Sequence, residues 1–190
     1  MKTLVACLLL LLFIQLTHAQ NDSACQRFIR SVIREKGVVY TDSIGTYAIK
    51  GMKTDFNEQL NSPENKDNSS SWVRSLRLTD AEIQYVNVQI GLQTQFAWKP
   101  GLVKRSTVIY EDSLKAIFKG NILTGWNYFH QHYGKSYHRF SKPIFLRNSS
   151  VCFFYFENSC GGLCGRGLFN IYIKRKGVWV MAYSISDWAS

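Results

Sequence analysis

Two apolar segments, Val151–Glu157 and Leu168–Lys174, flank the run Cys160-Gly161-Gly162-Leu163-Cys164-Gly165-Arg166-Gly167. Glycine is used where the backbone needs a positive φ or where two parts of a protein approach closely. Four glycines and two cysteines within eight residues therefore predict a tight connection between two strands, closed by a Cys160–Cys164 disulfide. The same glycines could form a backbone nest that binds an anion, with Arg166 as its charge. The sequence does not decide between these interpretations.

Extended segments separated by short turns fill the last third of the chain, and this arrangement predicts an antiparallel meander. Val151-Cys-Phe-Phe-Tyr-Phe156 is apolar at every position, which indicates a central strand in a sheet covered by helices on one side. The four predicted strands are Phe140–Leu146, Val151–Glu157, Leu168–Lys174 and Val178–Ser184.

Helical patterns precede the meander. The clearest is Thr79-Asp-Ala-Glu82, a capping box followed by apolar residues at helical spacing. Residues 57–71 are polar and contain Pro63, so they predict a mobile loop. The other predicted helices cover residues 23–36, a segment that begins at Asp112 or Ser113, and Ile122–Tyr133, and short strands are predicted at Val38–Tyr40, Thr46–Ile49 and Val103–Tyr110.

Helices first and a sheet last indicate an α+β fold, with N-terminal helices packed on a C-terminal antiparallel β-meander. A curved sheet of the cystatin-like or nuclear-transport-factor-like kind is suggested by analogy alone. The length of 190 residues suits one domain, which we place at residues 20–190.

The first 19 residues have the pattern of a secretory signal peptide. Lys2 is followed by an apolar run from Leu4 to Ile14, and the small residues Thr17 and Ala19 predict cleavage before Gln20. The run is too short to span a membrane, and no later segment is longer, so no integral membrane segment is expected after cleavage. The sequence thus predicts a secreted or periplasmic protein.

Four cysteines remain after this cleavage, and an even number in an exported chain favours disulfides. We favour a second bridge, Cys25–Cys152, which would tie the first helix to the sheet. Cys160 and Cys164 are also spaced like a pair of zinc ligands, but a second pair is missing, so we predict no metal site.

Positive charge is concentrated in the second half of the chain. Residues 20–98 hold nine Lys/Arg and nine Asp/Glu, whereas residues 99–190 hold thirteen Lys/Arg and four acids. This asymmetry suggests an anionic partner or surface, although a solvated face that keeps the domain soluble gives the same pattern about as often. The candidate binding residues are Arg139, Lys142, Arg147 and Arg166.

Three histidines lie close together, at positions 130, 132 and 138. His130 and His138 could act as an acid and base on a phosphodiester, with Lys135 on the phosphate. Aromatic packing with surface histidines explains the cluster more often. The glycine run lacks the Gly-Lys-Ser/Thr of a phosphate loop, and the sequence contains no Gly-x-Ser-x-Gly elbow. We therefore predict no cofactor and consider catalysis less favoured than binding.

The C-terminal third resembles a group of uncharacterised small secreted bacterial proteins. The resemblance lies in Ser141-Lys-Pro-Ile-Phe145, the Cys160–Gly167 run and Lys176-Gly-Val-Trp179, where the family usually has Lys in place of Val178. The resemblance supports secretion and a hairpin at the cysteines. It implies no activity.

Three functions remain open. The leading hypothesis is an exported, disulfide-stabilised domain that binds an anionic partner such as a glycan, lipopolysaccharide or nucleic acid. The first alternative is a ribonuclease-like phosphodiester hydrolase that uses His130 and His138. The second is an inhibitory or protein-interaction domain whose hairpin loop docks into another protein.

Overall fold

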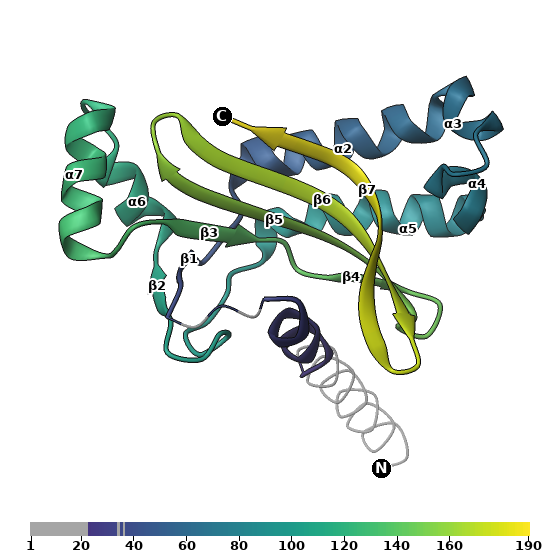
Figure 1. Ribbon diagram of the computed structural model, residues 1–190, viewed down its shortest axis with the longest axis horizontal. Helices are drawn as coiled ribbons and strands as arrows, with labels where there is room; N and C mark the ends of the chain where they lie inside the picture. The colour runs from purple at the N-terminus through teal and green to yellow at the C-terminus, as the bar shows by residue number, and fades with distance from the viewer. Residues whose placement is uncertain (1–22, 34, 36) are drawn as a thin grey trace, which may run out of the picture.

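The computed structural model describes residues 23–190 except 34 and 36. The fold is α+β, as the sequence predicts, with N-terminal helices and a C-terminal strand meander (Figure 1). A seven-stranded sheet has the order β2-β1-β3-β5-β6-β7, and β4 (Ile144–Leu146) pairs with β5 alone. The predicted signal peptide lies outside the described residues.

The meander consists of β5 (Val151–Gly161), β6 (Cys164–Arg175) and β7 (Val178–Ala189), all antiparallel. Lys176 and Gly177 both have positive φ, which is the conformation that a two-residue hairpin turn requires. The Cys160–Cys164 disulfide closes the other hairpin, as predicted. The three strands extend beyond their predicted ends. The sequence analysis missed these extensions because many side chains there are small or polar and form no strong apolar pattern.

The predicted strand at residues 140–146 is two strands. β3 (Tyr137–Phe140) and β4 both pair with β5, and the chain between them leaves the sheet. Pro143 has no N–H to donate to a ladder. The hydroxyl of Ser141 accepts a hydrogen bond from the backbone N–H of Tyr155 at 2.9 Å and so replaces the missing strand contact.

Two short strands extend the sheet in parallel beside β3. β1 (Val39–Thr41) lies between β3 and β2 (Thr107–Ile109) and pairs with both in parallel. The sequence indicates short strands in both places, but their partners lie far away in the chain. The local sequence pattern therefore does not predict that these two strands lie side by side at the edge of the sheet.

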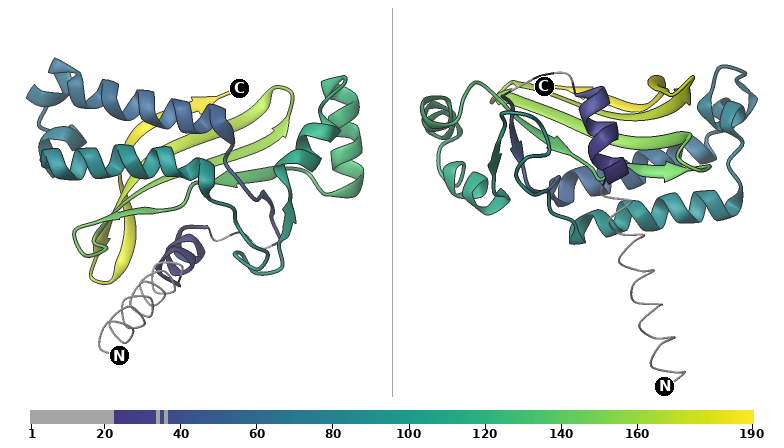
Figure 2. Two further views of the ribbon diagram at one scale, coloured as in Figure 1. Left: turned by 180° about the vertical axis from the view of Figure 1, so that it is seen from behind. Right: turned by 90° about the horizontal axis from the view of Figure 1, so that it is seen from below.

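Helices cover both faces of the sheet, and not one face as predicted (Figure 2). On one face α2 (Gly45–Asn61) and α5 (Asp80–Gly91) pack on Phe153, Tyr155 and Phe169. On the other face the helix over residues 23–32 packs on Cys152 and Phe154. Successive residues of β5 thus enter two different cores, which explains why residues 151–156 of this strand are all apolar.

Two local predictions are wrong. Residues 46–49 are the start of α2 and not a strand, because Ala48, Met52 and Phe56 recur every four residues and form one buried helical face. Residues 57–71 are not a loop: they include the end of α2 and the short helix α3 (Pro63–Asp67), whose first residue is the proline that helix starts tolerate. A further short helix, α4 (Trp72–Leu76), follows.

The capping box at Thr79 and Glu82 is confirmed at the start of α5. The remaining helices are α6 (Glu111–Ile117) and α7 (Ile122–His132), which pack with β1–β3 in a third apolar cluster at one end of the sheet. Within the described range, no helix is long and apolar enough to cross a membrane.

Candidate functional site

One row of directly paired residues crosses four strands of the sheet. Arg139 of β3 pairs with Glu157 of β5, Glu157 with Gly167 of β6, and Gly167 with Trp188 of β7. Paired residues on neighbouring strands project from the same face of the sheet. The row therefore brings a cation, an anion and an indole together on the face covered by α2.

The glycines of the Cys160–Gly167 run make room for Trp188. A Cβ atom on Gly167 would collide with the indole ring of Trp188, and one on Gly165 would lie 3.0 Å from the hydroxyl of Ser190. None of the four glycines in the run has a positive φ. They serve a tight connection and a close approach, and the anion-nest interpretation loses the left-handed backbone on which it depends.

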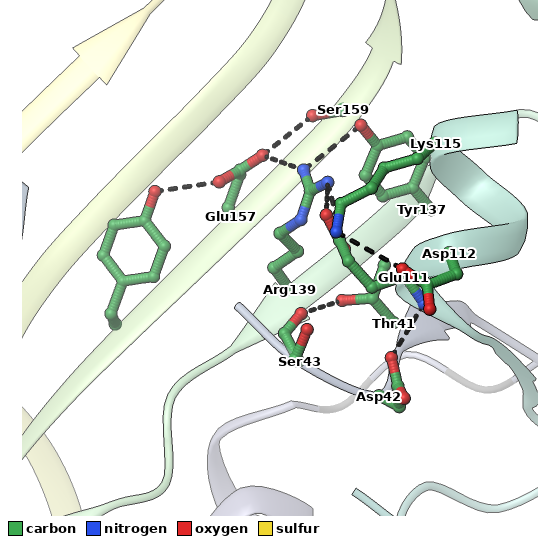
Figure 3. Close-up of polar contacts among 11 residues, drawn as sticks. Thr41, Asp42, Ser43, Glu111, Asp112, Lys115, Tyr137, Arg139, Glu157 and Ser159 are labelled. Carbon is green, nitrogen blue, oxygen red and sulfur yellow. Dashed lines mark hydrogen bonds and ion pairs between the residues drawn. The ribbon is translucent and has the colours of Figure 1, made fainter. Parts of the chain in front are cut away.

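Arg139 is the centre of a nearly buried charge network (Figure 3). Its guanidinium donates to Glu157 at 2.9 Å and to the Tyr137 hydroxyl at 3.2 Å, and both carboxylate oxygens of Glu111 lie 3.4 Å away. Burial alone would lower the pKa of Arg139, but the neighbouring Tyr137, Glu157 and Glu111 outweigh burial and raise it. The arginine is therefore a permanent charge that two glutamates share.

The two glutamates are held differently. Glu157 also accepts from the Ser159 hydroxyl at 3.1 Å and from the Tyr155 hydroxyl at 2.9 Å, and Trp188 in turn donates to Tyr155 at 3.3 Å. Burial, assisted by the charge of Glu157, raises the pKa of Tyr155, so this hydroxyl stays a donor at neutral pH. Among the described residues, the carboxylate of Glu111 has only the longer contacts to Arg139, so it has more capacity to accept hydrogen bonds from a ligand.

Two adjoining cavities share Glu111, Lys115, Arg139 and Trp188. The first, about 370 Å³, lies beside the start of α2. The second, about 310 Å³, runs between α6–α7 and the disulfide hairpin. Small residues of β5 and β6 border the second cavity, and apolar residues of the helices line its other side: Leu114, Phe118, Ile122 and Trp126. We call the two cavities together the groove.

The hairpin that borders this groove has an apolar tip. Leu163 is 91% exposed, between the two bridged cysteines. Across the second cavity, Ile122 and Leu123 at the start of α7 are also exposed. Large exposed apolar residues gathered beside a cavity are typical of interaction sites.

The four candidate anion-binding cations all contact other side chains of the protein. Arg139 is shared by two glutamates, Arg147 pairs with Glu82, and Arg166 pairs with Asp187. The ammonium of Lys142 lies 4.9 Å from the ring centre of Phe96. Each of these four side chains thus has an intramolecular contact.

The candidate catalytic residues also lie apart. The ring of His130 packs against Trp126 on α7, whereas His138 is 2% exposed on β3, between Phe140 and Phe156. Burial lowers the pKa of His138, and the charge of Glu35, 3.7 Å away, only partly opposes this. Lys135 lies in the turn between α7 and β3 and is exposed. No cluster of three or more His, Cys, Asp or Glu suited to a metal occurs in the part of the chain that the structure describes.

Cys25 and Cys152 are both buried in the core between the first helix and the sheet. The structure carries both as thiols. Burial, with a smaller contribution from Cys25, raises the pKa of the Cys152 thiol well above its usual value. The second bridge stays a prediction, and its two ends occupy the same core cluster.

Searches among protein-family models, curated proteins and solved structures found no match to this chain. The resemblance to small secreted bacterial proteins therefore stays a prediction, and so does the analogy to cystatin-like or nuclear-transport-factor-like sheets.

Sequence reasoning missed the partners of Arg139 and the role of Trp188. Glu111 and Glu157 are two of only four acids in the second half of the chain. Acids that are rare in a basic region are candidates for a specific pairing, and this signal could have directed attention to them. Trp188 lies beyond the predicted end of the last strand, so no pattern connected it with Gly167.

Proposed function

We propose that the protein is an exported interaction domain that binds an extended segment of another protein in the groove. It shares with the second alternative a protein partner and a role for the hairpin, but here the partner enters the groove, whereas that alternative has the hairpin loop docking into the partner. The observation that supports it most directly is Leu163, an almost fully exposed apolar side chain on a cross-linked hairpin beside a partly apolar cavity.

The chemistry of the groove suits a peptide better than a polyanion. Its four charged residues, Glu111, Lys115, Arg139 and Glu157, carry no net charge together. They offer both hydrogen-bond donors and acceptors, which match the N–H and C=O groups of a peptide backbone. The wall made by Leu114, Phe118, Ile122 and Trp126 then accepts an apolar side chain.

The rigid hairpin reduces the cost of binding. The disulfide fixes the loop before a partner arrives, so less conformational entropy is lost on association. Leu163 then acts as an anchor at the edge of the groove, because burial of its exposed apolar side chain by a partner is favourable.

A random peptide library displayed on phage tests this proposal, because the selection does not require the natural partner to be identified. We expect the oxidised protein to select peptides with a shared apolar residue, and Leu163→Asp to weaken their binding by about tenfold or more. Val178→Asp is the matched control, because Val178 is 63% exposed at the opposite end of β6 and β7. Peptides that bind Leu163→Asp as tightly as the unchanged protein would exclude the hairpin as the docking element.

The hydrolase alternative receives no support from the geometry. His130 and His138 lie on different elements, and the ring of His138 is enclosed by aromatic residues. A general acid or base must come within hydrogen-bond reach of its substrate.

A further inference from the structure

A separate cavity of about 390 Å³ lies on the opposite face of the sheet, where the helix over residues 23–32 meets the β6–β7 turn. Its polar walls come from different parts of the chain: Arg27 and Ser31 from the helix, Ser149 from the β4–β5 turn, and Lys174 from β6. None of the described residues that line it is acidic; the others are Ala24, Phe145, Gly177 and Trp179.

An aromatic ring, and not a carboxylate, holds the cation of Lys174. Lys174 and Trp179 are direct partners across β6 and β7, and the ammonium lies 5.5 Å from the centre of the indole ring. Trp179 is fixed in turn by edge-to-face contact with Phe28 at 5.2 Å. A cation–π contact orients the ammonium and leaves its N–H groups able to donate to a ligand.

Arg27 is similarly available. One of its nitrogens donates to the hydroxyl of Ser23 at 3.1 Å. Among the described residues no carboxylate lies within ion-pair distance of Arg27 or Lys174, whereas Arg139 has two such partners and Arg147 and Arg166 have one each. In the described part of the chain, Arg27 and Lys174 thus face this cavity without an acidic partner.

The β4–β5 turn contributes a hydroxyl. Arg147, Asn148 and Ser149 all have positive φ, between 52° and 59°, so three successive residues other than glycine adopt the left-handed conformation. Such residues are strained, and strain of this kind persists only where the surrounding structure imposes it. In this conformation Ser149 lines the cavity beside Lys174.

We propose that this cavity binds a tetrahedral oxyanion, the phosphate or sulfate group of a monoester. A guanidinium forms paired hydrogen bonds with such a group, and an ammonium and a hydroxyl complete its coordination. The volume admits the anion together with the first atoms of the molecule that carries it. The site is independent of the groove, and its occupancy does not depend on the proposed peptide binding.

Titration calorimetry on the purified, disulfide-bonded protein tests the site. The probes are inorganic phosphate, inorganic sulfate, glucose 6-phosphate and glucose 6-sulfate, with glucose as the neutral control. We expect saturable binding of the anions, weakened by added chloride. Arg27→Gln and Lys174→Gln should each weaken it by about tenfold.

Lys176→Gln is the matched variant, because it removes one charge from the β6–β7 turn, two residues from Lys174, and Lys176 does not line the cavity. It should change the affinity by less than about twofold, as expected for an exposed charge. Absence of saturable binding for every anion would overturn the proposal. An equal loss in Lys176→Gln and Lys174→Gln would also overturn it, because net charge alone would then explain the affinity. Thermal melts of all variants exclude unfolding as the cause.

Discussion

The two faces of the sheet bury polar groups in opposite ways. On the groove face Arg139 stays charged, and two glutamates from different elements surround it. On the other face, the neighbouring residue His138 lies between aromatic rings, and burial favours its neutral form. Adjacent residues of β3 thus enter opposite environments, because side chains alternate along a strand. A buried charge requires partners built from distant parts of the chain, whereas a neutral ring needs only good packing.

Removal of the charge at the centre of the groove face should have the largest effect. Arg139→Met leaves Glu111 and Glu157 close together without their shared cation, and we expect a loss of about 3–5 kcal/mol in the free energy of unfolding. Urea denaturation followed by tryptophan fluorescence measures this change.

Arg147→Met is the control for that prediction. Arg147 forms paired hydrogen bonds with Glu82, but both side chains are more exposed than that of Arg139, so its removal should cost clearly less stability than Arg139→Met. If both variants lose the same amount of stability, the Arg139 network contributes no more than a surface ion pair. The proposed difference between the two faces of the sheet would then be wrong.

On the opposite face of the sheet, a disulfide between Cys25 and Cys152 should increase the stability of the protein. In the background Cys160→Ser/Cys164→Ser, we expect oxidation to join Cys25 and Cys152 and to raise the free energy of unfolding by about 2–4 kcal/mol. Denaturation followed by alkylation and peptide mass mapping shows whether the two thiols remain. Two alkylated cysteines after oxidation would show that this core is held by packing alone.

A single methyl group should disturb the groove without touching its charges. Gly167→Ala places a carbon against the indole of Trp188, and such overpacking costs about 1–3 kcal/mol. The variant should also displace Trp188, which the indole N–H resonance in an NMR spectrum reports. Gly162→Ala is matched to it, because nothing lies within 4 Å of its added carbon. An unmoved Trp188 in Gly167→Ala would contradict the role given to this glycine.

The contrast between the faces also marks the limit of what the sequence reveals. The apolar run in β5 and the capping box at Thr79 are local signals. The capping box correctly predicted the start of α5, and the apolar run predicted a central strand but not the helix on the second face of the sheet. The Arg139 network is not local: its two acids lie 28 and 18 residues away along the chain. Only the register of β3 on β5 and the position of α6 bring them together, and neither can be derived from side-chain pattern. The four candidate binding cations were chosen by charge alone, and charge does not show which of them already have partners.

The smallest expected effect is a dependence of stability on pH that arises on the face opposite the groove. Because burial lowers the pKa of His138 in the folded protein, the unfolded chain binds its proton more readily, and stability should fall as the pH drops below about 6.5. The slope from one group cannot exceed about 1.4 kcal/mol per pH unit, and the nearby charge of Glu35 reduces the shift. His138→Phe should flatten the profile between pH 7.5 and 5, measured by urea denaturation at each pH, whereas His130→Phe on the exposed side of α7 should leave it unchanged. If His138→Phe keeps the full slope, another group causes it, and the neutral character of this face no longer depends on His138.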